Sequence, residues 1–143
     1  VSFSEETRLP SLLMEFPLSD GDPIQLIATH PLPPMQKSTW QDRNRAFAGL
    51  AEQVQQQGSQ RSIVAGDLNC TPWSYWFRRL REQSGLRESA LGHGLHSTWN
   101  PTSLPLPGLM IDHVLIGSRI NVARHFVGPD IGSDHRPVIV DFR

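Results

Sequence analysis

Strands that are apolar on both faces most constrain how this chain can fold. The run from Ile111 to Ile116 is apolar except at Asp112 and His113. Successive side chains of a strand point to opposite faces, so a strand of this kind must be covered on both sides. A single sheet with one face open to water is therefore excluded. A sheet packed on a second sheet, with helices outside, satisfies the requirement.

The remaining apolar runs and turn residues predict further strands and two helices. The predicted strands are 9–16, 23–30, 61–69, 97–100, 108–117, 120–128 and 136–142. The segment 38–58 predicts a helix that Ser38 caps and Gly58 ends. The segment 71–85 predicts a second helix, with Thr71 as its cap and Pro72 at its first position. Strand pairs separated by helices and followed by a run of strands predict an α/β (α+β) fold.

Apolar residues recur at helical spacing in both predicted helices. In the first helix they are Trp40, Phe47, Leu50, Ala51 and Val54, and in the second they are Trp73, Trp76, Phe77 and Leu80. We expect these stripes to face the sheet. For Trp73 and Trp76, the alternative is that they line a substrate groove.

Composition narrows the possible partners and locations. The chain has 143 residues, which suits one domain. Its net charge of −1 provides no broad basic field for duplex DNA, so any phosphate recognition must be local. The single cysteine, Cys70, cannot form an intrachain disulfide. No apolar stretch reaches the roughly 18 residues that span a bilayer.

Four polar clusters occupy the same kind of position, at or beside the end of a predicted strand. Their members are His30, Asp67 with Asn69, Asp112, and Asp134 with His135. Strand ends allow a rigid scaffold to present polar groups to solvent while its core stays dry. The placement therefore predicts a shared site at one edge of the sheet.

Each cluster also has a purely structural alternative. Asn69 could start the following helix, and His30 could be a solvated loop residue. Asp112 could belong to a structural ion pair, since a carboxylate within an apolar strand needs a partner. Asp134 could cap the turn before His135. As strand neighbours, Asp134 and His135 point to opposite sides and need separate partners.

The order of these motifs resembles that of the endonuclease/exonuclease/phosphatase superfamily of deoxyribonuclease-like phosphoesterases. The resemblance spans about residues 8–142, and the motif GSDHRP at 132–137 is its most specific part. The segments THPLPP, GDLNCTPWS and IDHVLIG are most similar to a bacterial branch whose catalytic domain often follows N-terminal membrane helices. That likeness allows a domain attached to a membrane through a segment upstream.

The resemblance implies a four-layer αββα sandwich and hydrolysis of phosphoester bonds with Mg²⁺ or Mn²⁺. Asp134 would be a metal ligand, and Asp67 and Asn69 would also lie at a cation. His135 and His30 would contact the phosphate or transfer protons. Asp112 would orient one histidine. Asp67 would activate the attacking water, and Asn69 would donate to a phosphate oxygen.

One part of the superfamily's pattern has no match in this sequence. An early strand-end Asn and a metal-ligating Glu are expected before the His30 motif, and Glu5, Glu6 and Glu15 do not stand in that setting. We therefore expect residues 1–143 to be one incomplete domain, its C-terminal half, whose partner is the missing N-terminal half. Such a fragment would bind metal weakly, turn over slowly or not at all, and self-associate through exposed sheet surface.

The sequence leaves several functions open. The substrate could be a nucleic acid, a phospholipid head group or a small phosphodiester. The rival hypothesis is a binding module that retains the phosphate pocket without catalysis, although a binder needs no proton-transfer pair. Among other residues, His93 and His96 suggest zinc only weakly, and we expect His113 and His125 to serve packing.

Overall fold

The computed structural model describes residues 11–19, 21–101 and 108–143, so Glu5 and Glu6 lie outside the described residues. In chain order the elements are β1 (Ser11–Leu18), β2 (Gly21–Thr29), α1 (Lys37–Gln57), the 3₁₀ turn η1 (Ser59–Arg61), β3 (Ser62–Asp67), α2 (Tyr75–Ser84), β4 (Arg87–Glu88), β5 (Asp112–Ile116), β6 (Val122–Val127) and β7 (Val138–Phe142).

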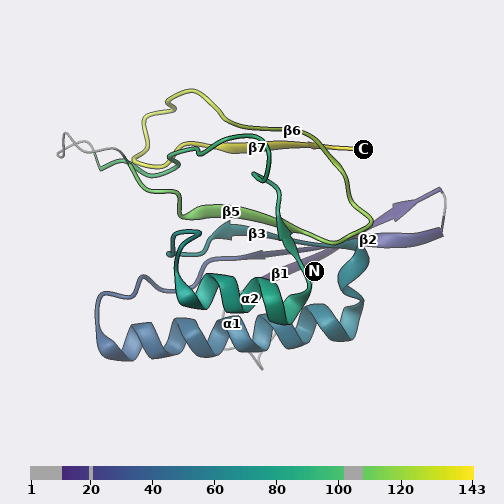
Figure 1. Cartoon of the computed structure of the whole chain (residues 1–143), viewed down its shortest axis with the longest axis horizontal. Coiled ribbons are helices and arrows are strands. Elements are labelled where there is room, and N and C mark those ends of the chain that lie inside the picture. Colours follow the sequence, from purple (N-terminus) through teal and green to yellow (C-terminus); the bar gives the residue numbers. More distant parts are fainter. Residues whose placement is uncertain (1–10, 20, 102–107) are drawn as a thin grey trace.

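The elements form stacked layers, as the doubly apolar strands require. Five strands make one sheet in the order β1-β2-β3-β5-β4, and β6 and β7 make a second sheet. The two helices cover one face of the larger sheet, and the β6–β7 sheet lies over its other face (Figure 1). The α/β class is confirmed. Of the four expected layers the described residues supply three, and they include no helix outside β6–β7.

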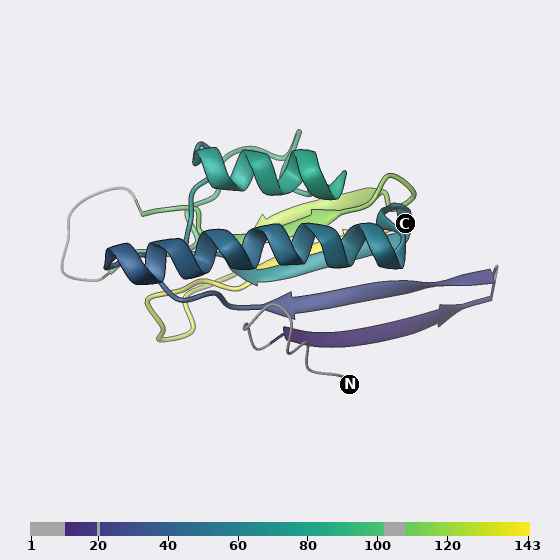
Figure 2. The same cartoon turned by 90° about the horizontal axis from the view of Figure 1, so that it is seen from below.

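Strand directions in the larger sheet decide where the polar clusters meet. β2 and β3 are parallel neighbours joined through α1, and β5 runs antiparallel to β3. The C-terminal ends of β2 and β3 and the start of β5 therefore lie at the same end of the sheet, where these strands meet the connecting loops. The β1–β2 hairpin extends past α1 at the opposite end (Figure 2).

The first helix agrees with its prediction except at its start. Gly58 ends α1 with a φ of +94°, a conformation that favours glycine. Ser38 is not the cap. Gln36 precedes the helix, and its backbone N–H donates to the Thr39 hydroxyl, which in turn donates to the Gln36 carbonyl. The reciprocal pair satisfies backbone groups that the first turn leaves open.

The second helix begins later than predicted, at Tyr75. Thr71 does not cap it, because the chain first makes a turn in which the Ser74 N–H donates to the Thr71 carbonyl at 3.0 Å. Trp73 lies in that turn and is 62% exposed, so its predicted place in the core is wrong. Pro72 is likewise outside the helix.

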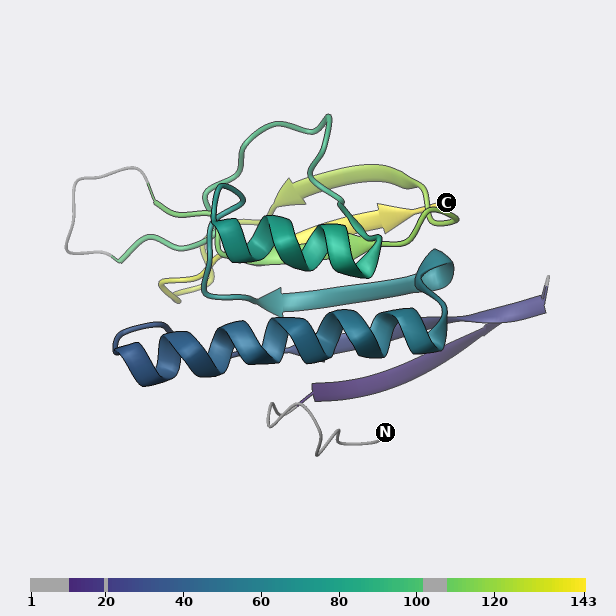
Figure 3. The same ribbon diagram turned by 60° about the horizontal axis from the view of Figure 1, so that its bottom comes forward.

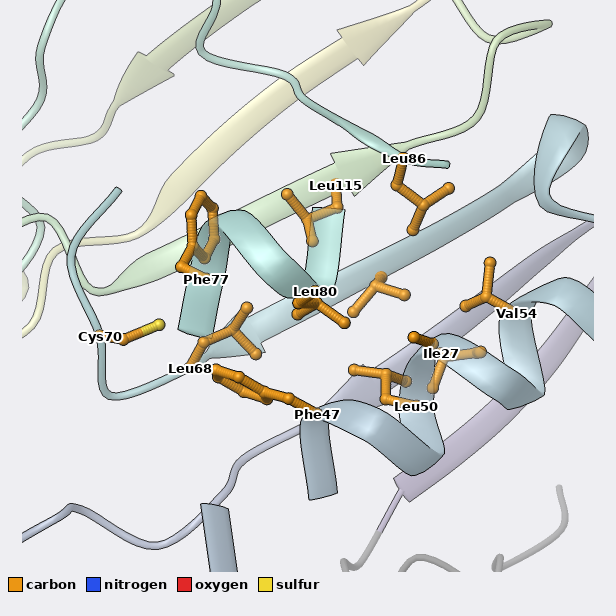
Figure 4. Packing of buried hydrophobic residues seen from close by; sticks show 12 residues of the cluster. Ile27, Phe47, Leu50, Val54, Leu68, Cys70, Phe77, Leu80, Leu86 and Leu115 are labelled. Atoms are coloured by element: carbon orange, nitrogen blue, oxygen red, sulfur yellow. The ribbon is translucent and has the colours of Figure 1, made fainter. Parts of the chain in front are cut away.

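The apolar stripes of both helices are otherwise buried. Phe77 and Leu80 of α2 pack with Phe47, Leu50 and Val54 of α1, and Trp76 is partly buried against them. Ile27, Val64 and Leu115 oppose them from the sheet (Figure 4). Trp40 departs from the prediction, since it is 42% exposed. Truncating a buried Leu or Phe to Ala in such a core typically costs about 2–5 kcal/mol.

Two predictions on short strands were wrong. Residues 97–100 form no strand. Trp99 makes only isolated bridges, to Leu109 and to His135. The two-residue strand β4 at the sheet edge was not predicted, because two residues carry no readable alternation.

The face of the larger sheet opposite the helices is only partly covered. Ile63, Ile116 and Ile120 are buried there, while Ile24, Leu26 and Val114 are partly exposed. Within the described residues, no helix combines the length and apolar character needed to cross a membrane.

Candidate active site

Parallel pairing places His30 and Asp67 at equivalent positions of neighbouring strands. Ala28 of β2 pairs with Ala65 of β3, and His30 and Asp67 each follow two residues later. Asp112, the first residue of β5, pairs directly with Asp67. Adjacent strands are about 4.8 Å apart. The side chains of His30, Asp67 and Asp112 therefore lie close together, where β2 and β3 end and β5 begins.

Gly66 allows the ends of β2 and β3 to lie close together. Its φ is +148°, and a Cβ there would lie 1.9 Å from the carbonyl oxygen of Thr29. Only glycine can therefore precede Asp67 while β2 approaches so closely. The Gly-Asp pair of the sequence motif thus has a geometric cause.

Asp112 and His135 are joined by hydrogen-bond contacts between their side chains. The Nδ1 atom of His135 lies 2.9 Å from Oδ2 and 3.2 Å from Oδ1 of Asp112. Since a carboxylate accepts hydrogen bonds, Nδ1 donates, and this fixes the orientation of the ring. The other nitrogen, Nε2, lies 3.9 Å from Asp67 Oδ2. Asp112 therefore has the partner that its apolar strand requires.

The second histidine, His30, approaches Asp67 from the side of β2, whereas Asp112 lies on the side of β5. His30 Nε2 lies 3.5 Å from Asp67 Oδ2, and the His30 side chain is 68% exposed against 14% for Asp67. One carboxylate thus faces two imidazoles, one solvated, the other held by Asp112. The predicted convergence of Asp67 with both imidazoles is what the structure shows.

Burial and neighbouring charges shift the pKa values of the central groups. Burial raises the pKa of Asp67 above its ordinary 3.8. The hydrogen bond from the Asn69 N–H opposes this shift, and the charge of Asp112 adds to it. Burial alone lowers the pKa of His135, but the hydrogen bond and charge of Asp112 outweigh it, so the net pKa is raised above 6.5. His135 therefore gains a proton near neutral pH more readily than a free imidazole.

Asn69 holds two loops of the site together. It has a left-handed backbone, with a φ of +50°, and its N–H donates to Asp67 Oδ1 at 2.8 Å. Its side-chain Nδ2 donates to the Pro31 carbonyl at 2.9 Å. The amide thus connects the segment after β3 to the segment that carries His30. The predicted role toward a phosphate oxygen is not visible, and it remains a prediction.

Asp134 lies at the rim, apart from the central group. Its Oδ2 accepts a hydrogen bond from the indole Nε1 of Trp99 at 3.0 Å, and this bond is the main reason that its pKa is lowered. Asp134 and His135 have different partners, as predicted, but the premise that they are strand neighbours was wrong, because both precede β7, which begins at Val138. The Trp99 ring lies 6.4 Å from the His135 ring, so Trp99 walls this side of the site.

The donor set suits a divalent cation only in part. One ligand atom each from Asp67, Asp112 and His135 lies within 4.8 Å of the others, and Asp134 is not in this group. Two carboxylates match the oxygen preference of Mg²⁺ and Mn²⁺, although Asp112 already accepts from His135. The residues fit one side of a coordination shell. The expected place of Asn69 at a cation remains a prediction.

A groove leads away from this group between the two sheets. It has a volume of about 340 Å³, and its lining includes Asp112, Ser133, His135, Arg136 and Val138.

Arg43 is a buried residue in contact with the site that was not predicted from the sequence. It is 5% exposed, and its Nη1 donates to the Asn69 carbonyl at 2.9 Å. The signal was present, because Arg43 precedes Phe47, Leu50 and Val54 at helical spacing on the buried face of α1. A cation on such a face must have a polar partner in the interior.

Comparison with known proteins agrees with these observations. The sequence matches the model of the Endonuclease/Exonuclease/phosphatase family over residues 5–135. No curated protein sequence matches.

Several solved structures share the fold at low sequence identity. A mannosyl-6-phosphatase of Bacteroides thetaiotaomicron has a TM-score of 0.72 at 17% identity, with 94% of this chain covering 57% of that one. The human Nocturnin catalytic domain has a TM-score of 0.72 at 19% identity, and the match covers 94% of this chain and 53% of that domain. An endonuclease/exonuclease/phosphatase from Beutenbergia cavernae has a TM-score of 0.76 at 18% identity, and the match covers 100% of this chain and 43% of that one. The chain thus spans about half the length of these structures.

Proposed function

Because the chain belongs to the endonuclease/exonuclease/phosphatase family, we propose that it supplies the phosphate-binding and proton-transfer side of a phosphoester hydrolase. The observation that carries the proposal is the convergence of Asp67, Asp112, His30 and His135 at one edge of the sheet. The names of the similar structures include a phosphatase and endonuclease/exonuclease/phosphatase proteins, which is consistent with this reaction class.

The contacts suggest a role for each group. His135, oriented by Asp112, presents Nε2 toward Asp67, where it can donate to a phosphate oxygen when protonated. His30 would contact the same phosphate from the solvent side. Asp67, whose pKa is raised by burial, would accept the proton of the attacking water. Asn69 would act mainly by holding the loops that carry Asp67 and His30.

A divalent cation completes the proposed chemistry. Asp67 and Asp112 would hold Mg²⁺ or Mn²⁺, with Asp134 as a further candidate ligand at the rim. When bound, the cation would withdraw negative charge from the phosphate oxygens. We also propose that a second part of the domain, corresponding to the half of the similar structures that this chain does not span, supplies further carboxylates.

The decisive experiment measures hydrolysis of bis(p-nitrophenyl) phosphate by the intact protein that contains this chain. We expect activity with Mg²⁺ or Mn²⁺ that EDTA abolishes. Asp112→Asn and His135→Gln should lower kcat by about 10²–10⁴-fold, the usual size of a general acid–base contribution. Glu15→Gln, on the exposed part of β1, is the matched control and should retain full activity.

Two outcomes would count against the proposal. Full turnover by either site variant would remove Asp112 and His135 from the mechanism. Phosphate binding without any hydrolysis, in the presence of either cation, would support the non-catalytic binding module instead. Circular dichroism of each variant separates loss of chemistry from loss of fold.

A further inference from the structure

A group of large apolar side chains is exposed close to the candidate active site. Leu32, Met35, Trp40, Trp73 and Tyr75 are 56%, 83%, 42%, 62% and 57% exposed. These five residues are here called the aromatic rim. Exposed apolar side chains scattered singly are normal on a protein surface, but a cluster of this kind is typical of an interaction surface.

The fold brings the members of the aromatic rim together. β2 and β3 are parallel, so the segments that follow them leave the same edge of the sheet and lead into α1 and α2. The two helices lie side by side and begin at the same end of the molecule (Figure 3). Trp76 connects them, since its ring lies edge-on to Trp40 at 5.9 Å and to Tyr75 at 5.3 Å.

The same two segments are positively charged, although the whole chain is not. Residues 30–41 contain Lys37, and residues 70–81 contain Arg78, Arg79 and Arg81, with no Asp or Glu in either segment. The chain as a whole has a net charge of −1. Arg79 lies over the Trp76 ring at 5.9 Å and donates to the Tyr75 hydroxyl at 3.2 Å. Arg79 is therefore part of the aromatic rim's surface.

This combination matches the chemistry of a membrane surface. Trp and Tyr favour the boundary between lipid chains and water, aliphatic side chains insert beyond it, and Lys and Arg attract anionic head groups. Single-stranded nucleic acid would also use aromatic rings and arginines. Leu32 and Met35 cannot stack on bases, however, and Met35 is the most exposed residue of the rim. The apolar composition thus favours lipid.

We propose that the aromatic rim docks on bilayers that contain anionic phospholipids, beside the site that would act on a phosphoester. The rim residues belong to α1, to α2 and to the segments that lead into them, and the two helices lie on the face of the sheet opposite the incompletely covered one. Docking itself does not depend on catalysis. Only the consequence for substrate class, a lipid phosphoester reached at the membrane surface, rests on the proposed function.

The test is co-sedimentation of the chain with vesicles of equal parts phosphatidylcholine and phosphatidylglycerol, with tryptophan emission as a second readout. We expect binding and a blue shift of the emission, both weaker on pure phosphatidylcholine and at high salt. The double variant Leu32→Ser/Met35→Ser should lower the partition coefficient by at least about tenfold. Arg78→Gln/Arg79→Gln should remove the preference for the anionic vesicles.

Matched controls lie at the opposite end of the sheet. Phe16→Ser, at a 47% exposed position of β1, and Arg119→Gln should both bind as the unmodified chain does. Equal losses in rim and control variants, or binding of an oligothymidylate but not of vesicles, would overturn the proposal. Asp112→Asn should dock normally. A docking chain whose intact protein hydrolyses no phosphoester would refute the proposed function while leaving the docking surface in place.

Discussion

At the scale of single residues, Arg43 shows how the interior controls the site. Its guanidinium is buried, and burial lowers its pKa. The Nε and Nη2 atoms both donate to Asn44 Oδ1, while Nη1 donates to the Asn69 carbonyl. Asn69 in turn holds Asp67 and Pro31. A buried helix residue thus holds the segment after β3, whose Asn69 N–H donates to Asp67.

We expect Arg43→Met to destabilise the chain by about 1–3 kcal/mol, because it leaves buried acceptors unpaired. Urea unfolding measures the change. Arg43→Lys keeps a charge but reaches fewer acceptors, so its loss should be smaller. Unchanged stability in the methionine variant would show that the contact to Asn69 has no energetic importance.

Residue types account for much of what could be predicted from the sequence here. Asp112 is the one carboxylate of an otherwise mostly apolar strand, and its need for a partner correctly indicated a polar contact, which proved to be with His135. Arg43 carries the same signal, but an arginine within a helix is far more often solvated, so its burial was not predicted. Asp134 was expected in the same site, but the structure places it at the rim, bonded to Trp99 and outside the group of Asp67, Asp112 and His135.

At the scale of elements, β6 is joined to the larger sheet through a buried histidine. His125 is 5% exposed, and its Nδ1 lies 2.9 Å from the Ser89 hydroxyl, just after β4. Its ring lies 5.4 Å from that of His96 and 6.3 Å from that of His93. The titratable groups that act on it are Glu88, His93, His96 and His113.

This histidine predicts a pH dependence of stability. Burial lowers the pKa of His125, Glu88 opposes the shift, and the neighbouring histidines add to it. The unfolded chain therefore binds a proton, near its ordinary pKa of 6.5, that the folded chain resists. The resulting stability is complete above about pH 6.5 and is lost as the pH falls below it, by at most about 1.4 kcal/mol per pH unit.

Urea unfolding between pH 5 and 8 tests this expectation. His125→Gln can still bond to Ser89, and its unfolding free energy should fall less steeply below pH 6.5 than that of the unmodified chain. His30→Gln, at an exposed position, is the control and should keep the original slope. Identical slopes for all three proteins would contradict a role for His125.

The elements also show where prediction from sequence stops. Gly58 was correctly predicted to end α1, because a glycine directly after an apolar stripe is typical of a helix C-terminus. The predicted starts of both helices were wrong, although Ser38 and Thr71 are residue types that favour helix caps. Gln36, paired with Thr39, precedes α1 instead, and Ser74 precedes α2. Trp73 was misplaced for the same reason. Local propensity does not determine which of several adjacent polar residues begins a helix.

At the scale of the whole molecule, one sheet face is only partly covered. By strand alternation Leu12 and Met14 of β1 lie on the same face as Ile24 and Leu26 of β2, and all four are only partly buried. The β6–β7 sheet packs over β3 and β5 instead, where Ile63 and Ile116 are buried. The apolar surface left open lies beside β1, the outermost strand of this sheet among the described residues.

We expect this surface to make the isolated 16.1 kDa chain self-associate. Light scattering after size exclusion should give a mass that rises with protein concentration. Leu26→Lys should reduce the association, whereas Ala48→Lys, on the exposed side of α1, should not. A strictly monomeric chain at high concentration would show that the sheet face needs no cover.

The parallel pairing of β2 and β3 has a consequence for how such a centre can diversify. The spacing of His30 and Asp67 is set by backbone hydrogen bonds between adjacent strands, and the long connection between them only has to return to the far edge. Insertions near Gly58 could therefore change the structure at that end of the molecule without changing the spacing between His30 and Asp67 at the other end. Related proteins could then differ at that end and keep the same spacing between His30 and Asp67.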